Sequence, residues 1–196
     1  MNLPLFPLNT VLFPGCKLDL QIFEARYLDM IGRCMKQSAG FGVVCIVEGE
    51  EVGDAAPRFS AIGCEALVRD FQQQPNGLLG IRVEGGRRFR VQHASVLPDQ
   101  LTVADAQWLE DEPDLALGEE HADLAALLSA LAQHPLVDSL GMGDEASGQS
   151  DLANQLGYLL PLLPEQKLQL LALDSPSERL LVLQEMIDQL QGDLNA

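Results

Sequence analysis

Few residues of this chain have the types and spacing that catalysis requires. The only lysines are Lys17, Lys36 and Lys167. None of them ends a Gly-x-x-x-x-Gly-Lys-Ser/Thr loop, the pattern with which many ATPases hold phosphates. The serines of residues 138–150 have neither a nearby lysine nor a Gly-x-Ser-x-Gly turn to activate them as nucleophiles. We therefore predict no catalytic residue, no cofactor, and neither ATP hydrolysis nor proteolysis by this chain.

The residue types that commonly bind metals are scattered along the sequence. The cysteines are Cys16, Cys34, Cys45 and Cys64, and the histidines are His93, His121 and His134. No two cysteines are separated by the two residues of a zinc knuckle or a redox pair. Zinc sites need clustered ligands, and cytosolic thiols usually stay reduced. We predict no metal site and four reduced cysteines.

One cluster of basic residues occurs in the first half of the chain. Its members are Arg82, Arg87, Arg88 and Arg90. Because side chains alternate along a strand, Arg88 and Arg90 should share an outward face while Phe89 points into the core. We assign Arg82, Arg88 and Arg90 as a possible basic contact for nucleic acid. The chain has only one Trp and two Tyr with which to stack bases, which argues against this role.

A second candidate site lies near expected turns and edges and would contact polypeptide. Its residues are Leu12, Phe13, Ile22, Phe23, Arg26 and Tyr27. Exposed apolar residues of this kind mark interaction sites on folded domains. The alternative, which we favour for Phe13 and Phe23, is that these side chains are buried and close the core. Glu24 and Arg26 should point to different sides of a helix start, with Arg26 tying the helix to a strand carbonyl.

The first segments of the chain would position that site. Pro4 and Pro7 lack amide donors, so residues 3–8 should form an edge strand or an extended segment that could accept an extended peptide. Pro14-Gly15 is a turn signal. A helix should begin near Phe23, with its apolar face at Tyr27, Met30, Ile31 and Cys34.

Strand patterns dominate the rest of the first half. Strands are predicted over 41–48, 59–71, 78–83, 89–96 and 101–108. The turn residues Pro75-Asn-Gly77 separate two of them, and Gly85-Gly86 separates two more, so 78–83 and 89–96 should pair as an antiparallel hairpin. Several short strands with one early helix predict a small closed or partly closed barrel over residues 1–110.

The pattern becomes helical after Trp108. An acidic connector over 110–114 leads to leucines at helical spacing over 124–131 and 152–163, with a loop over 138–150 between them. Pro164 can begin a short helix at its first turn. Ser175-Pro-Ser-Glu178 is a capping box that begins the last helix. These signals predict an acidic helical bundle over residues 118–192.

Composition and charge narrow the class of protein. The chain has 196 residues, is 47% hydrophobic and carries a formal net charge of −17. Nearly all of this charge follows residue 104, where Lys167 and Arg179 are the only Lys or Arg residues. Such an acidic half repels phosphate backbones and anionic membranes. No apolar run reaches the roughly 20 residues that span a bilayer, and there is no export signal, so we expect a cytoplasmic protein.

Several phrases of the sequence resemble the N-terminal domain of Lon, the ATP-dependent protease. They are Leu3-Pro-Leu-Phe-Pro-Leu8, Phe13-Pro-Gly15, Ile22-Phe-Glu-Ala-Arg-Tyr27, Ile62-Gly63 and the stretch from Gly80 to Val91. The resemblance runs from Asn2 to about residue 190. It implies an α+β fold, with a PUA-like barrel followed by a helical bundle. Cereblon-type proteins carry a similar domain.

The resemblance implies a non-catalytic module that binds polypeptide substrates or a protein partner. The sequence reaches Ala196 without the ATPase and protease modules of Lon. One alternative is an adaptor or regulator of a separate ATP-dependent protease. Another is an RNA-binding PUA-like protein that uses the arginine cluster, which the acidic second half argues against. We expect a polypeptide or protein partner rather than nucleic acid or membrane; the residues leave the oligomeric state open.

Overall fold

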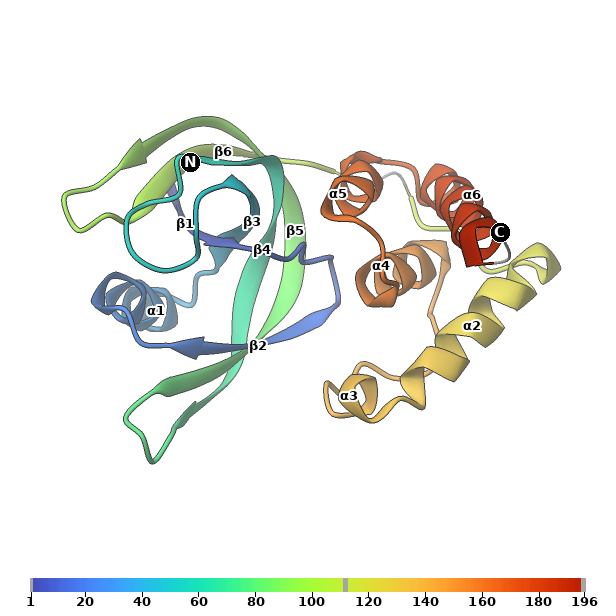
Figure 1. Ribbon diagram of the computed structural model, residues 1–196, viewed down its shortest axis with the longest axis horizontal. Coiled ribbons are helices and arrows are strands. Elements are labelled where there is room, and N and C mark those ends of the chain that lie inside the picture. The colour runs from blue at the N-terminus through green and yellow to red at the C-terminus, as the bar shows by residue number, and fades with distance from the viewer. Residues whose placement is uncertain (1, 111–112, 195–196) are drawn as a thin grey trace. The chain divides into compact units, whose positions relative to one another are not determined.

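The computed structural model describes residues 2–110 and 113–194, which belong to two compact units, Met1–Leu109 and Glu110–Ala196. Figure 1 labels the helices and strands. The first unit contains six strands and helix α1 (Ala25–Gln37), and the described part of the second is helical. The α+β fold class is thus confirmed. The predicted acidic connector over 110–114 lies partly outside the described residues.

The first unit is a mixed sheet that closes on itself. The strands are β1 (Asn2–Leu8), β2 (Lys17–Ile22), β3 (Phe41–Glu48), β4 (Arg58–Gln73), β5 (Leu79–Val96) and β6 (Thr102–Trp108). Their order is β2-β5-β4-β3-β1-β6, and an additional pairing of β6 with β5 closes β5, β4, β3, β1 and β6 into a ring. The predicted partly closed barrel is therefore confirmed.

The long strand β5 makes this closure possible. It runs beside β4 in Figure 1 and pairs with it from Leu79 to Arg90. On its other side β5 pairs first with β2, up to Glu84, and then with β6 from Phe89 onward. A single strand therefore joins the open part of the sheet to the closed ring.

The predicted hairpin between 78–83 and 89–96 is wrong, because β5 continues through Gly85-Gly86. These glycines admit a neighbouring loop instead of a turn. The Gly15 amide donates to the Gly85 carbonyl and the Gly85 amide donates to the Cys16 carbonyl, each at 2.8 Å. A Cβ atom on Gly85 would overlap the carbonyl oxygen of Phe13. Glycine is needed here for close approach of two backbones.

The other predicted hairpin is confirmed. The β4–β5 connection turns at Pro75-Asn-Gly77, where Gly77 has a φ of +82° and the Gln74 amide donates to the Leu78 carbonyl at 2.8 Å. Positive φ is the conformation that glycine adopts without steric cost. The predicted strands over 41–48 and 101–108 correspond to β3 and β6, and 59–71 lies within β4.

Strand β1 is not the edge strand that its prolines suggested. It pairs antiparallel with β6 over Asn2–Pro4 and parallel with β3 over Leu5–Leu8. Pro4 pairs with Val103 of β6 and Pro7 pairs with Val44 of β3, so each proline lies in a segment with a partner on one side. A proline is compatible with such a one-sided position because its missing amide can face away from the partner.

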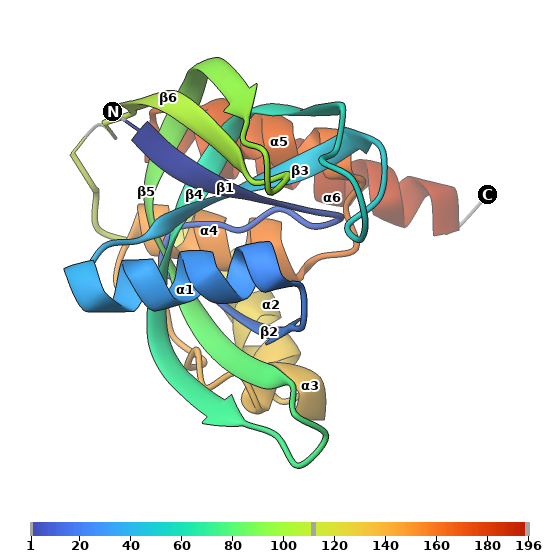
Figure 2. The ribbon, with the colours of Figure 1, turned by 90° about the vertical axis from the view of Figure 1, so that its left-hand side faces the viewer.

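Helix α1 packs across the sheet, as Figure 2 shows. Its buried face contains the apolar residues expected from helical spacing, Tyr27, Met30, Ile31 and Cys34. The Tyr27 ring contacts that of Phe6, with ring centroids 4.0 Å apart. The apolar face of α1 and the inner face of β1 therefore share one core.

The described part of the second unit is built from helices. They are the 3-10 turn η1 (Glu119–His121), α2 (Ala122–Ala132), α3 (Pro135–Asp138), α4 (Gln149–Leu159), α5 (Pro164–Ala172) and α6 (Pro176–Leu194). Leu128, Leu156 and Leu183 are among the leucines that fill the core of this unit. The predicted helical segment is therefore confirmed, and no helix of the described residues is long and apolar enough to cross a bilayer.

Two details of the second unit differ between prediction and structure. The leucines over 152–163 do not form one helical face, because α4 ends at Leu159 and Leu163 is 64% exposed. Pro164 begins α5 and Pro176 begins α6, as predicted. The Glu178 amide donates to the Ser175 hydroxyl at 3.4 Å, which supplies one half of the predicted capping box.

The close approach at Gly85 leads to a stability prediction. Gly85→Ala should lower the free energy of unfolding by about 1–3 kcal/mol, because its methyl group displaces the Phe13–Cys16 backbone and strains two hydrogen bonds. Gly32→Ala is the control, since a Cβ there meets no atom within 4 Å. Alanine favours a helix over glycine, so Gly32→Ala should leave stability unchanged or raise it. Urea denaturation measures both, and equal effects of the two variants would contradict the prediction.

Candidate functional site

Arg26 is a structural centre of the first unit. Its side chain is 5% exposed, and Nη2 lies 3.0 Å from Glu24 Oε2. Nη1 donates to the Gln100 carbonyl at 2.9 Å, and Nη2 donates to the Gly53 carbonyl at 2.5 Å. The predicted tie to a carbonyl is present, but the carbonyls belong to the loops after β3 and β5 and not to strands. Arg26 therefore fastens two loops to the start of α1.

Glu24 and Arg26 do not point to different sides as the sequence suggested. Glu24 is the N-cap of α1 and has extended backbone angles, φ −78° and ψ 133°. Because Glu24 is not helical, the rotation of about 100° per residue that separates side chains on a helix does not apply between Glu24 and Arg26. Their side chains meet in an ion pair, which neutralises part of the charge on the buried guanidinium.

The other residues of the predicted polypeptide site divide by burial. Leu12, Phe13, Ile22 and Tyr27 are each 5% exposed or less. Burial also raises the pKa of the Tyr27 hydroxyl. The interpretation that Phe13 closes the core is confirmed, whereas for Phe23 it is wrong, since Phe23 is 54% exposed. Ile22, Phe23 and Tyr27 line a small pocket of about 160 Å³ at the start of α1.

The three arginines of the predicted basic contact lie in different environments. Arg82 makes a two-pronged ion pair with Asp19, with Nε–Oδ1 and Nη2–Oδ2 distances of 2.7 and 2.8 Å. The hydrogen bond from Arg82 lowers the pKa of the Asp19 carboxyl, and partial burial opposes this shift. Arg90 is exposed, whereas Arg88 is only 1% exposed. The structure does not bring these residues together on one exposed face.

Arg88 is buried and so cannot offer the outward basic contact that was predicted, although it lies on the predicted face of β5. An irregularity in the β4–β5 ladder lies just before it. Cys64 pairs with Arg88, but Ala66 pairs with Gly85, so β5 contains an extra residue between these two pairs. Such a bulge shifts the alternation of side chains relative to the part of β5 before it. Residues 88–90 pair in regular register with Cys64, Gly63 and Ile62, so Arg88 and Phe89 point to opposite faces, and both are buried.

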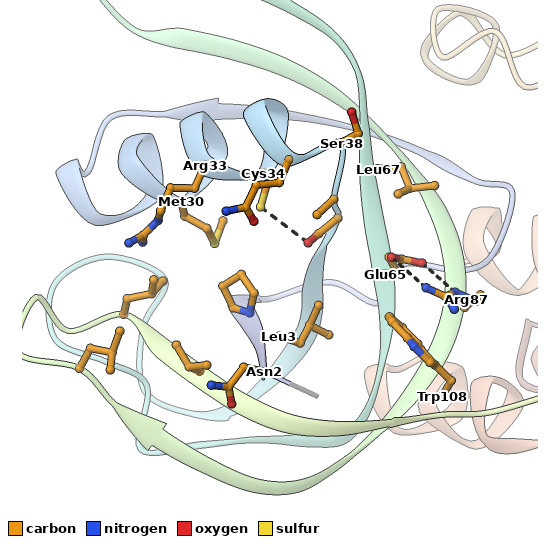
Figure 3. A pocket seen from close by; sticks show the side chains of 17 residues that line it. Asn2, Leu3, Met30, Arg33, Cys34, Ser38, Glu65, Leu67, Arg87 and Trp108 are labelled. Atoms are coloured by element: carbon orange, nitrogen blue, oxygen red, sulfur yellow. Dashed lines mark hydrogen bonds and ion pairs between the residues drawn. The ribbon is translucent and has the colours of Figure 1, made fainter.

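A concave surface of the first unit with a largely apolar lining was not predicted. It is a cavity of about 460 Å³ between the second half of α1 and the rim of the barrel (Figure 3). Apolar lining comes from Leu3, Met30, Leu67, Leu97, Leu101, Val103 and Trp108. At one end Arg87 Nε lies 3.2 Å from Glu65 Oε2, and the Arg87 guanidinium lies 3.8 Å from the centre of the Trp108 ring. The cavity therefore has an apolar lining and a charged end.

A second, shallower cavity of about 330 Å³ adjoins the first. The two share Cys34, Ser38, Ala39 and Leu67 in their linings. The second adds Met35 from α1 and Phe71 from β4, which are 40% and 58% exposed. We call the two cavities together the α1 groove.

Sequence patterns could not locate the α1 groove because its residues come from separate segments. Met35 falls next to the buried face of α1, Phe71 is a single apolar residue among polar ones, and Leu97 directly follows the end of β5. The one sequence feature that could have indicated a binding surface was the presence of large apolar residues outside the periodic core positions. Only the fold places them beside one another.

The chain matches a known protein family over nearly its full length. A family model for the ATP-dependent protease La (LON) substrate-binding domain matches residues 2–189. The crystal structure of a Lon N-terminal domain protein from Xanthomonas campestris is similar, with a TM-score of 0.74 and 36% identity over 92% of this chain and 95% of that chain.

Two further relatives are more distant. The N-terminal domain of Mycobacterium avium complex Lon protease has a TM-score of 0.61 and 20% identity, over 93% of this chain and 96% of that chain, which is a likeness in fold. The Lon protease of Flavobacterium johnsoniae is 25% identical over 192 residues, which cover 92% of this chain. The chain thus corresponds to 23% of the length of that protease.

The contacts of Arg26 lead to a second stability prediction. Arg26→Met should lower the free energy of unfolding by about 2–4 kcal/mol, because it leaves several buried carbonyl and carboxylate acceptors without their donor. Hydrogen exchange should rise in the loops that contain Gly53 and Gln100. Arg33→Met, at an exposed position on the same helix, is the control and should have little effect. Unchanged exchange in both loops would contradict the assigned structural role.

The ion pair between Asp19 and Arg82 predicts a dependence on pH. The pKa of Asp19 is lowered in the folded state, so its contribution to stability is present at neutral pH and is lost as the pH falls below about 4. Asp19→Asn should therefore lower the Tm at pH 7, and this difference from the wild type should shrink towards pH 3. Asp54→Asn, at an exposed loop position, serves as the control. A difference that stays constant with pH would exclude this role for the ion pair.

Proposed function

This chain belongs to the family of Lon substrate-binding domains, and we propose that it acts as a non-catalytic module that binds polypeptide. Its ligand is an unfolded segment of a substrate or of a protein partner. Under this proposal, ATP hydrolysis and peptide-bond cleavage belong to other modules. The observation that carries the proposal is the α1 groove, with its continuous apolar lining and exposed rim.

The size and lining of the groove suit side chains of a polypeptide. Its larger cavity, about 460 Å³, lies within the range of roughly 300–1,000 Å³ that is common for ligand sites. Met35 and Leu97 are 40% and 37% exposed at its borders, so a bound segment would remove apolar surface from water. Phe23, beside the smaller pocket at the other end of α1, is a further proposed contact.

The chemistry of the groove favours binding over catalysis. Cys34 lines it, but burial raises the pKa of this thiol and so keeps it protonated. A protonated thiol is a poor nucleophile. Glu65 is held by Arg87, which leaves this carboxylate in a structural ion pair.

Nucleic-acid binding receives less support from the arginine cluster. Arg82 is paired with Asp19, Arg87 with Glu65, and Arg88 is buried. A phosphate backbone would have to compete with two carboxylates for these cations. We therefore place polypeptide ahead of RNA as the ligand class.

Binding of an unfolded protein tests the proposal. A fluorescent protein fragment, reduced and carboxamidomethylated, should bind the wild-type chain in an anisotropy titration. Met35→Asp and Leu97→Asp should each weaken binding by about tenfold, because each introduces a charge where apolar surface is buried.

Val47→Asp is the matched control. Val47 is 55% exposed and lies near the end of β3, outside the residues that line the groove. This variant should bind as the wild type does, and circular dichroism should show all three variants folded. Absence of binding by the wild type, or equal losses in the control and groove variants, would exclude the groove as the site.

A further inference from the structure

We propose that the second half of β4, residues 67–73, pairs with an extended polypeptide segment that adds a strand to the sheet. We call this part of β4 the open edge. The inference rests on the proposed function and specifies how the polypeptide is held, through main-chain hydrogen bonds as well as apolar contacts.

The open edge results from the different lengths of neighbouring strands. β5 pairs with β4 as far as Gln73, but the pairing of β3 with β4 ends at Phe41 and Ala66. β3 cannot extend further, because the preceding residues turn into α1 at Ser38, which has a φ of 52°. In the described part of the chain, no strand pairs with the far side of β4 beyond Ala66. Figure 2 shows β4 and β5 continuing past α1, and β2 pairs with this part of β5 on the side away from β4.

A side chain occupies one hydrogen-bonding position on this edge. The Phe71 amide donates to Oδ1 of the adjacent Asp70 at 2.8 Å. The carboxylate thus accepts the bond that the carbonyl of a partner strand would accept in a continuous sheet. Local side-chain acceptors of this kind compete with ladder hydrogen bonds and can be replaced by them. An incoming strand has a donor available at Phe71 once Asp70 moves aside.

The adjoining cavity indicates which occupant fits. Leu67, Val68 and Arg69 all line the cavity of about 330 Å³. Leu67 and Val68 are successive residues in regular register with β5 and point to opposite faces, so a cavity lined by both lies along the edge of β4 and not over one face. A row of main-chain donors and acceptors is satisfied by another extended backbone, whereas the backbone of a helix is already paired. The occupant is therefore an extended segment.

The side chains around the edge specify the composition of that segment. Met35 borders the cavity from α1 and Phe71 borders it from β4. Both are largely apolar and partly exposed, at 40% and 58%. A segment with apolar residues at alternate positions would cover them while its main chain pairs with β4.

A β-bulge in β4 restricts which strands can pair with the open edge. Val68 pairs with Val83 and Asp70 with Arg82, so Arg69 is an extra residue in β4. Bulges twist an edge and discourage unrestricted pairing between copies of a protein. A short, flexible segment can follow such a twisted edge, whereas a flat preformed sheet cannot.

Strand β2 offers the nearest alternative edge. It pairs with β5 and is the first strand in the sheet order. A pocket of about 160 Å³ beside it is bordered by the carboxylates of Asp19, Glu24 and Glu51. A larger one, of about 630 Å³, is lined by β2, β5 and β4 together, mostly by charged and polar residues such as Asp19, Asp70 and Arg82. The more apolar surroundings of β4 favour its open edge for an uncharged apolar segment.

Backbone-modified peptides test the inference directly. The probe is the labelled peptide acetyl-Lys-Thr-Val-Thr-Leu-Thr-Val-Lys-amide, measured by anisotropy. Two further versions carry N-methyl groups on alternate amides, one on the apolar and one on the threonine positions. In a strand, alternate amides face the same partner, so one version should lose about tenfold in affinity and the other should bind nearly as well as the parent.

Paired variants at one position locate the contact. Phe71→Ser removes the aromatic side chain but keeps the amide, whereas Phe71→Pro removes the amide as well. The serine variant should bind the parent peptide a few-fold more weakly, and the proline variant about tenfold more weakly than the serine variant. If Phe71→Pro does not fold, hydrogen exchange of the wild type supplies the same information, with slower exchange over 67–73 when peptide is bound.

The possible failures are distinguishable. Equal binding of all three peptides would overturn strand addition while leaving the proposed function intact. Protection over β2 with none over residues 67–73 would also overturn it. If neither the parent peptide nor the unfolded protein fragment binds, the proposed function itself fails.

Discussion

The first unit depends on the exchange of partners along β5. One side of this strand keeps β4 as a neighbour, while the other side changes from β2 to β6 across the stretch that contains Gly85. At the change-over, the loop before β2 hydrogen-bonds to Gly85 and occupies space that any side chain would need. The β4–β5 ladder also changes register between Gly85 and Arg88, directly before the buried residues Arg88 and Phe89. The closed ring and the part of the sheet formed by β2, β5 and β4 therefore meet at this backbone contact.

Arg26 supplies hydrogen bonds to two irregular connections of the same unit. The connections after β3 and β5 are irregular, so their carbonyl groups have no strand to accept from. The buried guanidinium donates to one carbonyl in each connection and also meets Glu24 at the start of α1. A planar cation with several donors suits such a junction better than an ammonium group does. One side chain thus links the start of α1 to both connections.

The sequence predicted those features that depend on local chemistry. The buried face of α1 follows from a helical repeat, and the turn at Gly77 follows from the conformational freedom of glycine. Features that depend on contacts between distant segments were missed. Nothing in Gly85-Gly86 distinguishes a turn from a close backbone approach until the position of Phe13 is known. The prolines of β1 suggested an edge strand. The sequence does not show that β6 pairs with the first half of β1 and β3 with the second half.

The pairing of β1 also determines the order in which the barrel can assemble. Asn2 pairs with Asp105 and Pro4 with Val103, so the first residues of the chain must wait for the last strand of the unit. During synthesis on a ribosome, the ring cannot close until β6 has emerged. Contacts so distant in sequence form slowly, since a long loop must be ordered first. We expect closure of the barrel to be a late step in folding, whereas the helical unit relies on contacts between nearer segments.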